Sequence, residues 1–166
     1  MASDIYLRTL TVYYEEEVEG EAYFHALAER LSDPDQAAKM RLLGDVETYA
    51  AEAVRPLIDK YGLTPKSAAD LQASGRAAAA AQAADWDAVI GEWRRTFPGY
   101  IDDFEGLKAM APPEDLSPLK ILTDHEHAAI AFLEAEVAGQ PDPAAPLRHY
   151  LATGSAVAPD GGWAAL

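Results

Sequence analysis

One stretch of this chain, residues 7–31, limits the possible folds more than any other. It reads LRTLTVYYEEEVEGEAYFHALAERL, and as an α-helix it lines up its apolar residues in one stripe. Ser3 or Asp4 is a suitable N-cap for this helix. Three ionisable residues, Glu17, Glu21 and His25, fall inside that stripe, each about one helical turn after the last. A buried carboxylate is costly unless it is paired. We therefore expect these side chains to face a metal ion, a shared proton or a dense hydrogen-bond network.

A second amphipathic helix is expected over residues 34–61. Asp33 is a suitable N-cap, Pro34 suits the first helical position, and Gly62 provides a C-terminal stop. The short loop before this helix makes the first two helices antiparallel neighbours. Glu47 projects with the apolar residues of the second helix, so we expect it to meet the carboxylates of the first helix near mid-length.

Two more segments show the same helical spacing of apolar residues. In the third, from Trp86 to Leu107, the apolar stripe continues across Pro98, which predicts a kinked helix or two helices that share a face. The fourth is expected to begin with Ser117 as its N-cap and to end at residue 139. His125, Glu126 and Glu136 project with the apolar side of this fourth helix.

These four segments predict an all-α protein, an antiparallel four-helix bundle over residues 1–138. The connection between the second and third helices, about 63–85, is long enough for a crossover, with a short helix that stops before Gly75. Residues 139–166 form a Pro-, Gly- and Ala-rich tail that we expect to pack irregularly on the bundle or on a partner subunit.

Length and charge exclude several classes of function. The 166 residues suit one domain, and 49% of them are hydrophobic, as expected for a chain with a packed core. The net charge of −15 disfavours binding to nucleic acid or to anionic membranes. There is no cysteine, and no window approaches the roughly 18 apolar residues of a membrane span. With no secretory signal visible in MASDIYLRTL, we expect a cytoplasmic protein.

At this point the chain resembles the ferritin-like superfamily, in particular its rubrerythrin-type branch of di-iron carboxylate bundles. The resemblance rests on Gly20-Glu21-Ala22-Tyr23 in the first helix, on Glu47, and on His125-Glu126 in the fourth helix. It implies Glu21, Glu47 and His125 as metal ligands, and the chain itself offers Glu17, His25, Glu126 and Glu136 as supplementary ones. The ligand set it implies is incomplete, because two further ligand positions hold Ala50 and Leu122.

The resemblance implies one or two ions of iron, or of manganese or zinc, in the helix core and oxidoreductase-type chemistry on a small molecule. A homodimer is expected. The alternative is a metal-free helical module for binding or oligomerisation, in which Glu17, Glu21 and Glu47 hydrogen-bond to nearby polar groups and hold some protons. No cofactor is needed in that case. A third alternative is a small-ligand pocket lined by Trp86, Trp93, Tyr14 and Tyr100.

Overall fold

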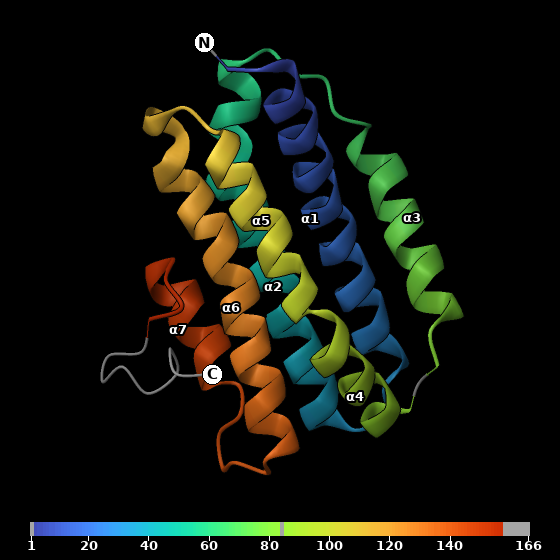
Figure 1. The fold of residues 1–166 in the computed structure, drawn as a ribbon. Coiled ribbons are helices and arrows are strands. Elements are labelled where there is room, and N and C mark those ends of the chain that lie inside the picture. Colours follow the sequence, from blue (N-terminus) through green and yellow to red (C-terminus); the bar gives the residue numbers. More distant parts are fainter. Residues whose placement is uncertain (1, 84, 158–166) are drawn as a thin grey trace.

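A computed structural model gives the structure of the chain and describes residues 2–83 and 85–157 (Figure 1). These residues form helices joined by short turns, and no β-strand occurs among them, which confirms the all-α prediction. The elements in chain order are α1 (Asp4–Arg30), α2 (Pro34–Lys60), α3 (Ala68–Ala81), α4 (Trp86–Thr96), α5 (Pro98–Met110), the 3₁₀ turn η1 (Pro113–Asp115), α6 (Leu116–Val137) and α7 (Ala145–Thr153).

The first two helices begin at the residues that their caps predict. The Ser3 hydroxyl accepts a hydrogen bond from the Tyr6 amide at the start of α1. The carboxylate of Asp33 accepts hydrogen bonds from the first amides of α2. Gly62 follows the end of α2 with φ of 61°, a left-handed conformation that glycine adopts without strain. An N-cap therefore fixes the start of each helix, and Gly62 stops α2 at its other end.

The crossover differs from its prediction, because α3 continues through Gly75 as one helix. A Cβ atom at Gly75 would lie only 2.2 Å from the backbone carbonyl oxygen of Glu19. Gly75 therefore does not break α3. It lets the backbone of α3 approach α1 closely enough to pack against it.

The aromatic stripe from Trp86 to Leu107 forms two helices, α4 and α5, that meet at Pro98, as predicted. The predicted start of the fourth helix is wrong. Helix α6 begins at Leu116, and Ser117 lies inside its first turn. Asp115 fixes the chain at this point, because its buried carboxylate accepts hydrogen bonds from the hydroxyls of Tyr6 and Tyr61 and from the Lys60 ammonium group (2.6–2.8 Å). These contacts tie the start of α6 to α1 and α2.

The tail packs on the bundle as far as the structure describes it. Helix α7 lies against α2 and α6, and the Tyr150 hydroxyl donates to the Ile121 carbonyl oxygen (3.0 Å). Thr123, which helical spacing places on the solvent side of α6, is buried. The prediction for residues 158–166 falls outside the described part of the chain.

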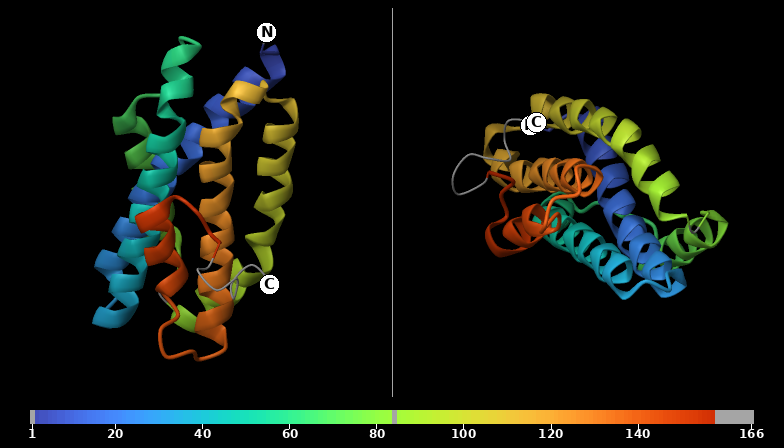
Figure 2. Two further views of the ribbon diagram at one scale, coloured as in Figure 1. Left: turned by 90° about the vertical axis from the view of Figure 1, so that its left-hand side faces the viewer. Right: turned by 90° about the horizontal axis from the view of Figure 1, so that it is seen from below.

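The long helices pack around a common interior (Figures 1 and 2). Helix α1 contacts α2 and α5, α6 contacts α2 and α5, and α3 lies on the outer side of α1. In Figure 1, α1, α3 and α6 run downward, whereas α2 and α5 run upward. None of the described helices is both long and apolar enough to cross a membrane.

The interior contains two apolar clusters, and polar residues mark the level between them. Along α1, Glu17 lies between Leu10 of one cluster and Phe24 of the other. Glu47 on α2 lies between Val46 and Ala50, which belong to different clusters. His125 on α6 likewise lies between Leu122 and Ala128, one from each cluster. The fold thus places one polar residue from each of three helices at one level of the core.

Candidate metal centre

Glu17 is the buried carboxylate of α1. Only 3% of its surface is exposed. Its position follows from spacing: Leu10, Glu17 and Phe24 are seven residues apart, so all three project from the same side of the helix toward the core. The sequence therefore forces an ionisable group into the interior, where it needs a partner.

Glu47 reaches the same level of the core from α2. Its side chain is 13% exposed and extends across Gly20 of α1. A Cβ atom at Gly20 would lie 3.0 Å from Glu47 Oε2 and 3.1 Å from its Cδ. The missing side chain at Gly20 therefore provides the space that the Glu47 carboxylate occupies.

His125 supplies the third group from α6, and 2% of it is exposed. Its ring meets Phe104 of α5 edge to face at 5.3 Å. Its Nδ1 lies in hydrogen-bond contact with the Leu122 carbonyl oxygen, which can only accept, so we assign the ring proton to Nδ1. In the neutral ring, the lone pair of Nε2 then points toward the carboxylates, the arrangement found for metal-binding histidines.

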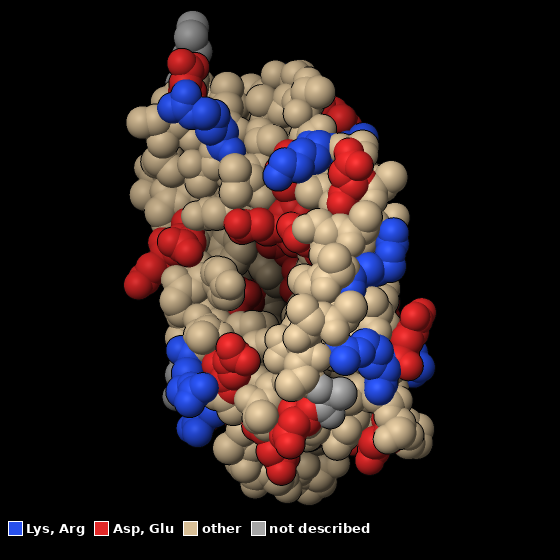
Figure 3. All heavy atoms as spheres, turned by 90° about the vertical axis from the view of Figure 1, so that its right-hand side faces the viewer, with Lys and Arg blue, Asp and Glu red and all other residues tan. Residues whose placement is uncertain are grey.

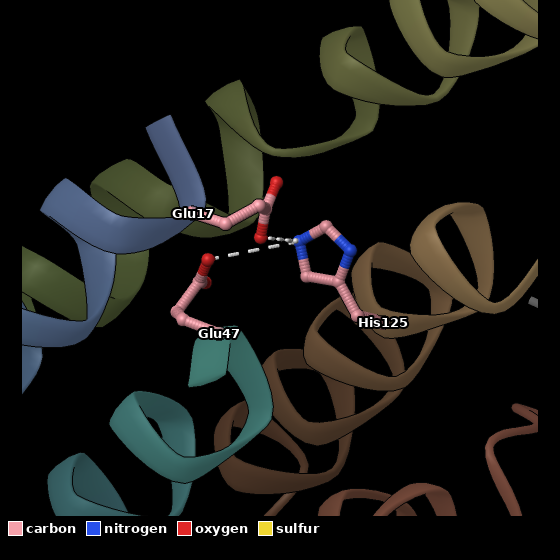
Figure 4. Close-up of side chains that lie close together, drawn as sticks. All are labelled: Glu17, Glu47 and His125. Atoms are coloured by element: carbon pink, nitrogen blue, oxygen red, sulfur yellow. Dashed lines mark ion pairs between the residues drawn. The ribbon is translucent and has the colours of Figure 1, made fainter. Parts of the chain in front are cut away.

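The three groups converge on one point (Figure 4). His125 Nε2 lies 3.2 Å from Glu17 Oε2 and 3.9 Å from Glu47 Oε2. One ligand atom from each residue lies within 4.8 Å of the others. Around one ion with bonds of about 2.1 Å, ligand atoms are separated by about 3.0–4.2 Å. The three ligand atoms would therefore fit around one metal ion after moving slightly closer together.

The cluster lacks a balancing charge among the described residues. Burial, and then the nearby charges of Glu47 and Glu126, raise the pKa of Glu17 well above its ordinary value. Burial and the charge of Glu47 likewise raise the pKa of Glu126. Glu17 Oε2 has no hydrogen-bond partner among residues 2–83 and 85–157, and the approach of His125 Nε2 at 3.2 Å lacks hydrogen-bond geometry. Either bound protons or a metal cation must compensate the negative charge of these carboxylates.

Two of the predicted ligands, Glu21 and His25, lie outside the cluster. Their side chains are 32% and 38% exposed, and His25 Nε2 lies 3.2 Å from Asp45 on the surface of α2. A residue four positions further along an α-helix is rotated by about 40°. The row Glu17, Glu21, His25 therefore turns progressively away from the buried face of α1, and His25 no longer lies on that face. Glu17, and not Glu21, is the α1 carboxylate that meets Glu47 and His125.

Glu126 is a fourth buried ionisable group at this level. Its Oε2 lies 3.6 Å from His125 Nε2, and its Oε1 is buried with no hydrogen-bond partner in the described part of the chain. It is not part of the group of three possible ligands. The other acidic residue predicted on this side of α6, Glu136, lies elsewhere and pairs with Lys39 (2.8 Å).

A cavity of about 530 Å³ opens onto the cluster. Figure 3 shows a hollow in the surface with acidic side chains gathered around and within it. Six carboxylates line the cavity, and its described lining includes no lysine or arginine: Glu16, Glu17, Glu19, Glu47, Glu92 and Glu126. Helical spacing cannot reveal this cavity, because its walls come from α1, α2, α3, α4, α5 and α6. The cluster is therefore accessible to a small molecule.

Comparison of the chain with protein-family models, with curated proteins and with solved structures finds no match. The functional argument therefore depends on the residues themselves.

Proposed function

We propose that this chain is a metal-binding protein that holds one divalent transition-metal ion between Glu17, Glu47 and His125. The observation that carries the proposal is the orientation of His125. Its Nδ1 contacts the Leu122 carbonyl oxygen, while its Nε2 meets two carboxylates that form no ion pair with a lysine or arginine of the described chain. Two carboxylate oxygens and one imidazole nitrogen suit Fe²⁺, Mn²⁺ or Zn²⁺.

A ferritin-like four-helix bundle is the architecture that we propose for this site. It is supported by the packing of α1, α2, α5 and α6 around one interior and by the course of α3, which lets α2 and α5 run in the same direction. The candidate ligands come from α1, α2 and α6. Helix α5 contributes Phe104 at this level, so the centre that we propose is smaller than a di-iron site.

Oxidoreductase-type chemistry on a small molecule is the activity that we propose, from the resemblance to ferritin-like proteins. A bound iron or manganese ion would supply redox chemistry with oxygen. In this arrangement Glu17 and Glu47 neutralise the ion, and the contact with Leu122 holds the His125 ring in its orientation. The cavity that opens onto these groups would let a small molecule reach the ion. We also propose that the chain forms a homodimer and is located in the cytoplasm.

A metal-free module remains the rival function, and one observation favours it. The raised pKa values of Glu17 and Glu126 allow both carboxyl groups to remain protonated, which would satisfy the core with hydrogen bonds alone. Metal content distinguishes the two functions.

The test is metal analysis of the full chain, produced with iron, manganese and zinc in the medium and purified without chelator. We expect about one ion per chain in the wild type and little metal in the double variant Glu17→Gln/His125→Ala. The matched control, Glu21→Gln/His25→Ala, changes the same residue types on the exposed part of α1 and should keep the metal. Substoichiometric metal that is equal in all three proteins would contradict the proposal and support the metal-free module.

A further inference from the structure

The cavity beside the proposed metal centre has an aromatic wall that a metal ion does not require. Trp93, Phe97, Tyr100 and Phe104 recur every three or four residues along α4 and α5 and line it. Trp93 stacks on Phe97 at 5.6 Å, and Phe97 meets Tyr100 edge to face at 6.0 Å. Cavities of about 300–1,000 Å³ hold drug-sized molecules, so the 530 Å³ found here exceeds the need of one ion.

The same cavity attracts positive charge. Its outer part carries Glu16 and Glu92, which are exposed, and Glu19, which is half-buried. Aromatic faces also attract cations, because the electrons of the ring give each face a partial negative charge. The described lining contains carboxylates and aromatic faces but no lysine or arginine. The cavity therefore favours an organic cation over a neutral or anionic molecule.

Glu126 shows where the charged end of such a molecule would bind. The residue is 5% exposed and lines the cavity. Its Oε1 is buried and accepts no hydrogen bond from any described residue. A buried carboxylate oxygen is stabilised by a charged N–H donor, and this atom lacks one. Glu126 is also outside the group of three possible metal ligands.

We infer that the cavity binds a primary ammonium compound with an apolar body, whose ammonium group donates to Glu126 and whose body packs on the aromatic wall of α4 and α5. A primary ammonium group has the N–H donors that the Glu126 carboxylate lacks. It also supplies the counter-charge that a buried carboxylate requires. The role of this molecule as a substrate rests on the proposed metal function, whereas its binding can be measured alone.

The test is isothermal titration calorimetry of the full chain after removal of metal by chelation. The probe is 2-phenylethylammonium, compared with 2-phenylethanol, which has a similar shape but no charge, and with methylammonium, which has the charge but no apolar body. We expect 2-phenylethylammonium to bind one to one, at least about tenfold more tightly than either comparison molecule. Equal affinity for 2-phenylethanol or for methylammonium would overturn the inference.

Three variants locate the binding site. Glu126→Gln keeps the size of the side chain but removes its charge, and should weaken binding of 2-phenylethylammonium by about tenfold or more. Tyr100→Leu changes a side chain that is 48% exposed, so the fold should tolerate it, and the lost aromatic face should weaken binding by about three- to tenfold. The control Glu105→Gln removes one exposed acidic charge of α5 outside the cavity and should leave the affinity unchanged.

Wild-type affinity in Glu126→Gln or in Tyr100→Leu would overturn the inference, and circular dichroism of each variant checks its fold. If Glu126→Gln does not fold, Tyr100→Leu decides alone. Metal binding without ammonium binding would overturn this inference only, and ammonium binding without metal would overturn the proposed metal function only.

Discussion

Replacing Gly20 by alanine should weaken metal binding without destabilising the metal-free protein. The new Cβ would lie 3.0 Å from Glu47 Oε2, 3.1 Å from Cδ and 3.3 Å from Cγ. Ordinary van der Waals contact begins at about 3.4 Å. The Glu47 carboxylate must therefore move by several tenths of an ångström, whereas metal sites tolerate only about 0.2 Å in a ligand distance.

The expected loss of metal affinity for Gly20→Ala is about ten- to a hundredfold, the usual result of displacing a group that orients a ligand. Alanine has a higher helix propensity than glycine by about 1 kcal/mol, so the metal-free variant should be at least as stable as the wild type. Affinity is measured by competition of Zn²⁺ with a chelating dye. Stability is measured by urea unfolding of chelated protein.

Gly106→Ala is the matched control for this experiment. Gly106 lies in α5, and a Cβ atom there meets no atom within 4 Å. The control should gain the same helix propensity and keep wild-type metal affinity. If Gly20→Ala binds Zn²⁺ as tightly as Gly106→Ala does, Glu47 in its present position is not a ligand, and the reasoning is refuted.

Three further predictions concern stability. Asp115→Ala should lower the free energy of unfolding by about 2 kcal/mol, because the buried Tyr6 hydroxyl loses its acceptor; urea unfolding showing a change below about 0.5 kcal/mol would contradict this. Gly75→Ala should cost about 2 kcal/mol and speed hydrogen exchange in α3, since its Cβ would clash with a backbone oxygen of α1; unchanged exchange would argue against the close packing. The raised pKa values of Glu17 and Glu126 stabilise the metal-free fold at low pH, and this contribution is lost as the pH rises through them. Metal-stripped protein should therefore resist urea better at pH 5 than at pH 8, and Glu126→Gln should reduce the difference.

Local chemistry was enough to predict most of the helices. Ser3 and Asp33 cap α1 and α2 as expected, and Pro98 divides the third segment into two helices with a shared face. The sequence could not show that α3 packs closely on α1. The run RAAAAA, residues 76–81 of α3, has no distinct apolar face, and the contact of α3 with α1 depends on the absence of a Cβ atom at Gly75.

The candidate site could be predicted only in part. Glu17, Glu47 and His125 were all expected in the core, but the choice between Glu17 and Glu21 depends on the rotation of α1 against its neighbours. The two side chains differ by about 40° around the helix, and spacing alone places both near the apolar stripe. The role of Gly20 depends on a contact with another helix, and the cavity depends on the packing of helices that are distant in sequence.

The central claim is tested most directly by a crystal structure of the full chain soaked with Zn²⁺, with anomalous scattering recorded on both sides of the zinc absorption edge. The account predicts one strong anomalous peak in the core, at about 2.0–2.2 Å from Glu17 Oε2, Glu47 Oε2 and His125 Nε2. An empty core, with the carboxyl groups hydrogen-bonded to one another and zinc only on the surface beside His25, would contradict it.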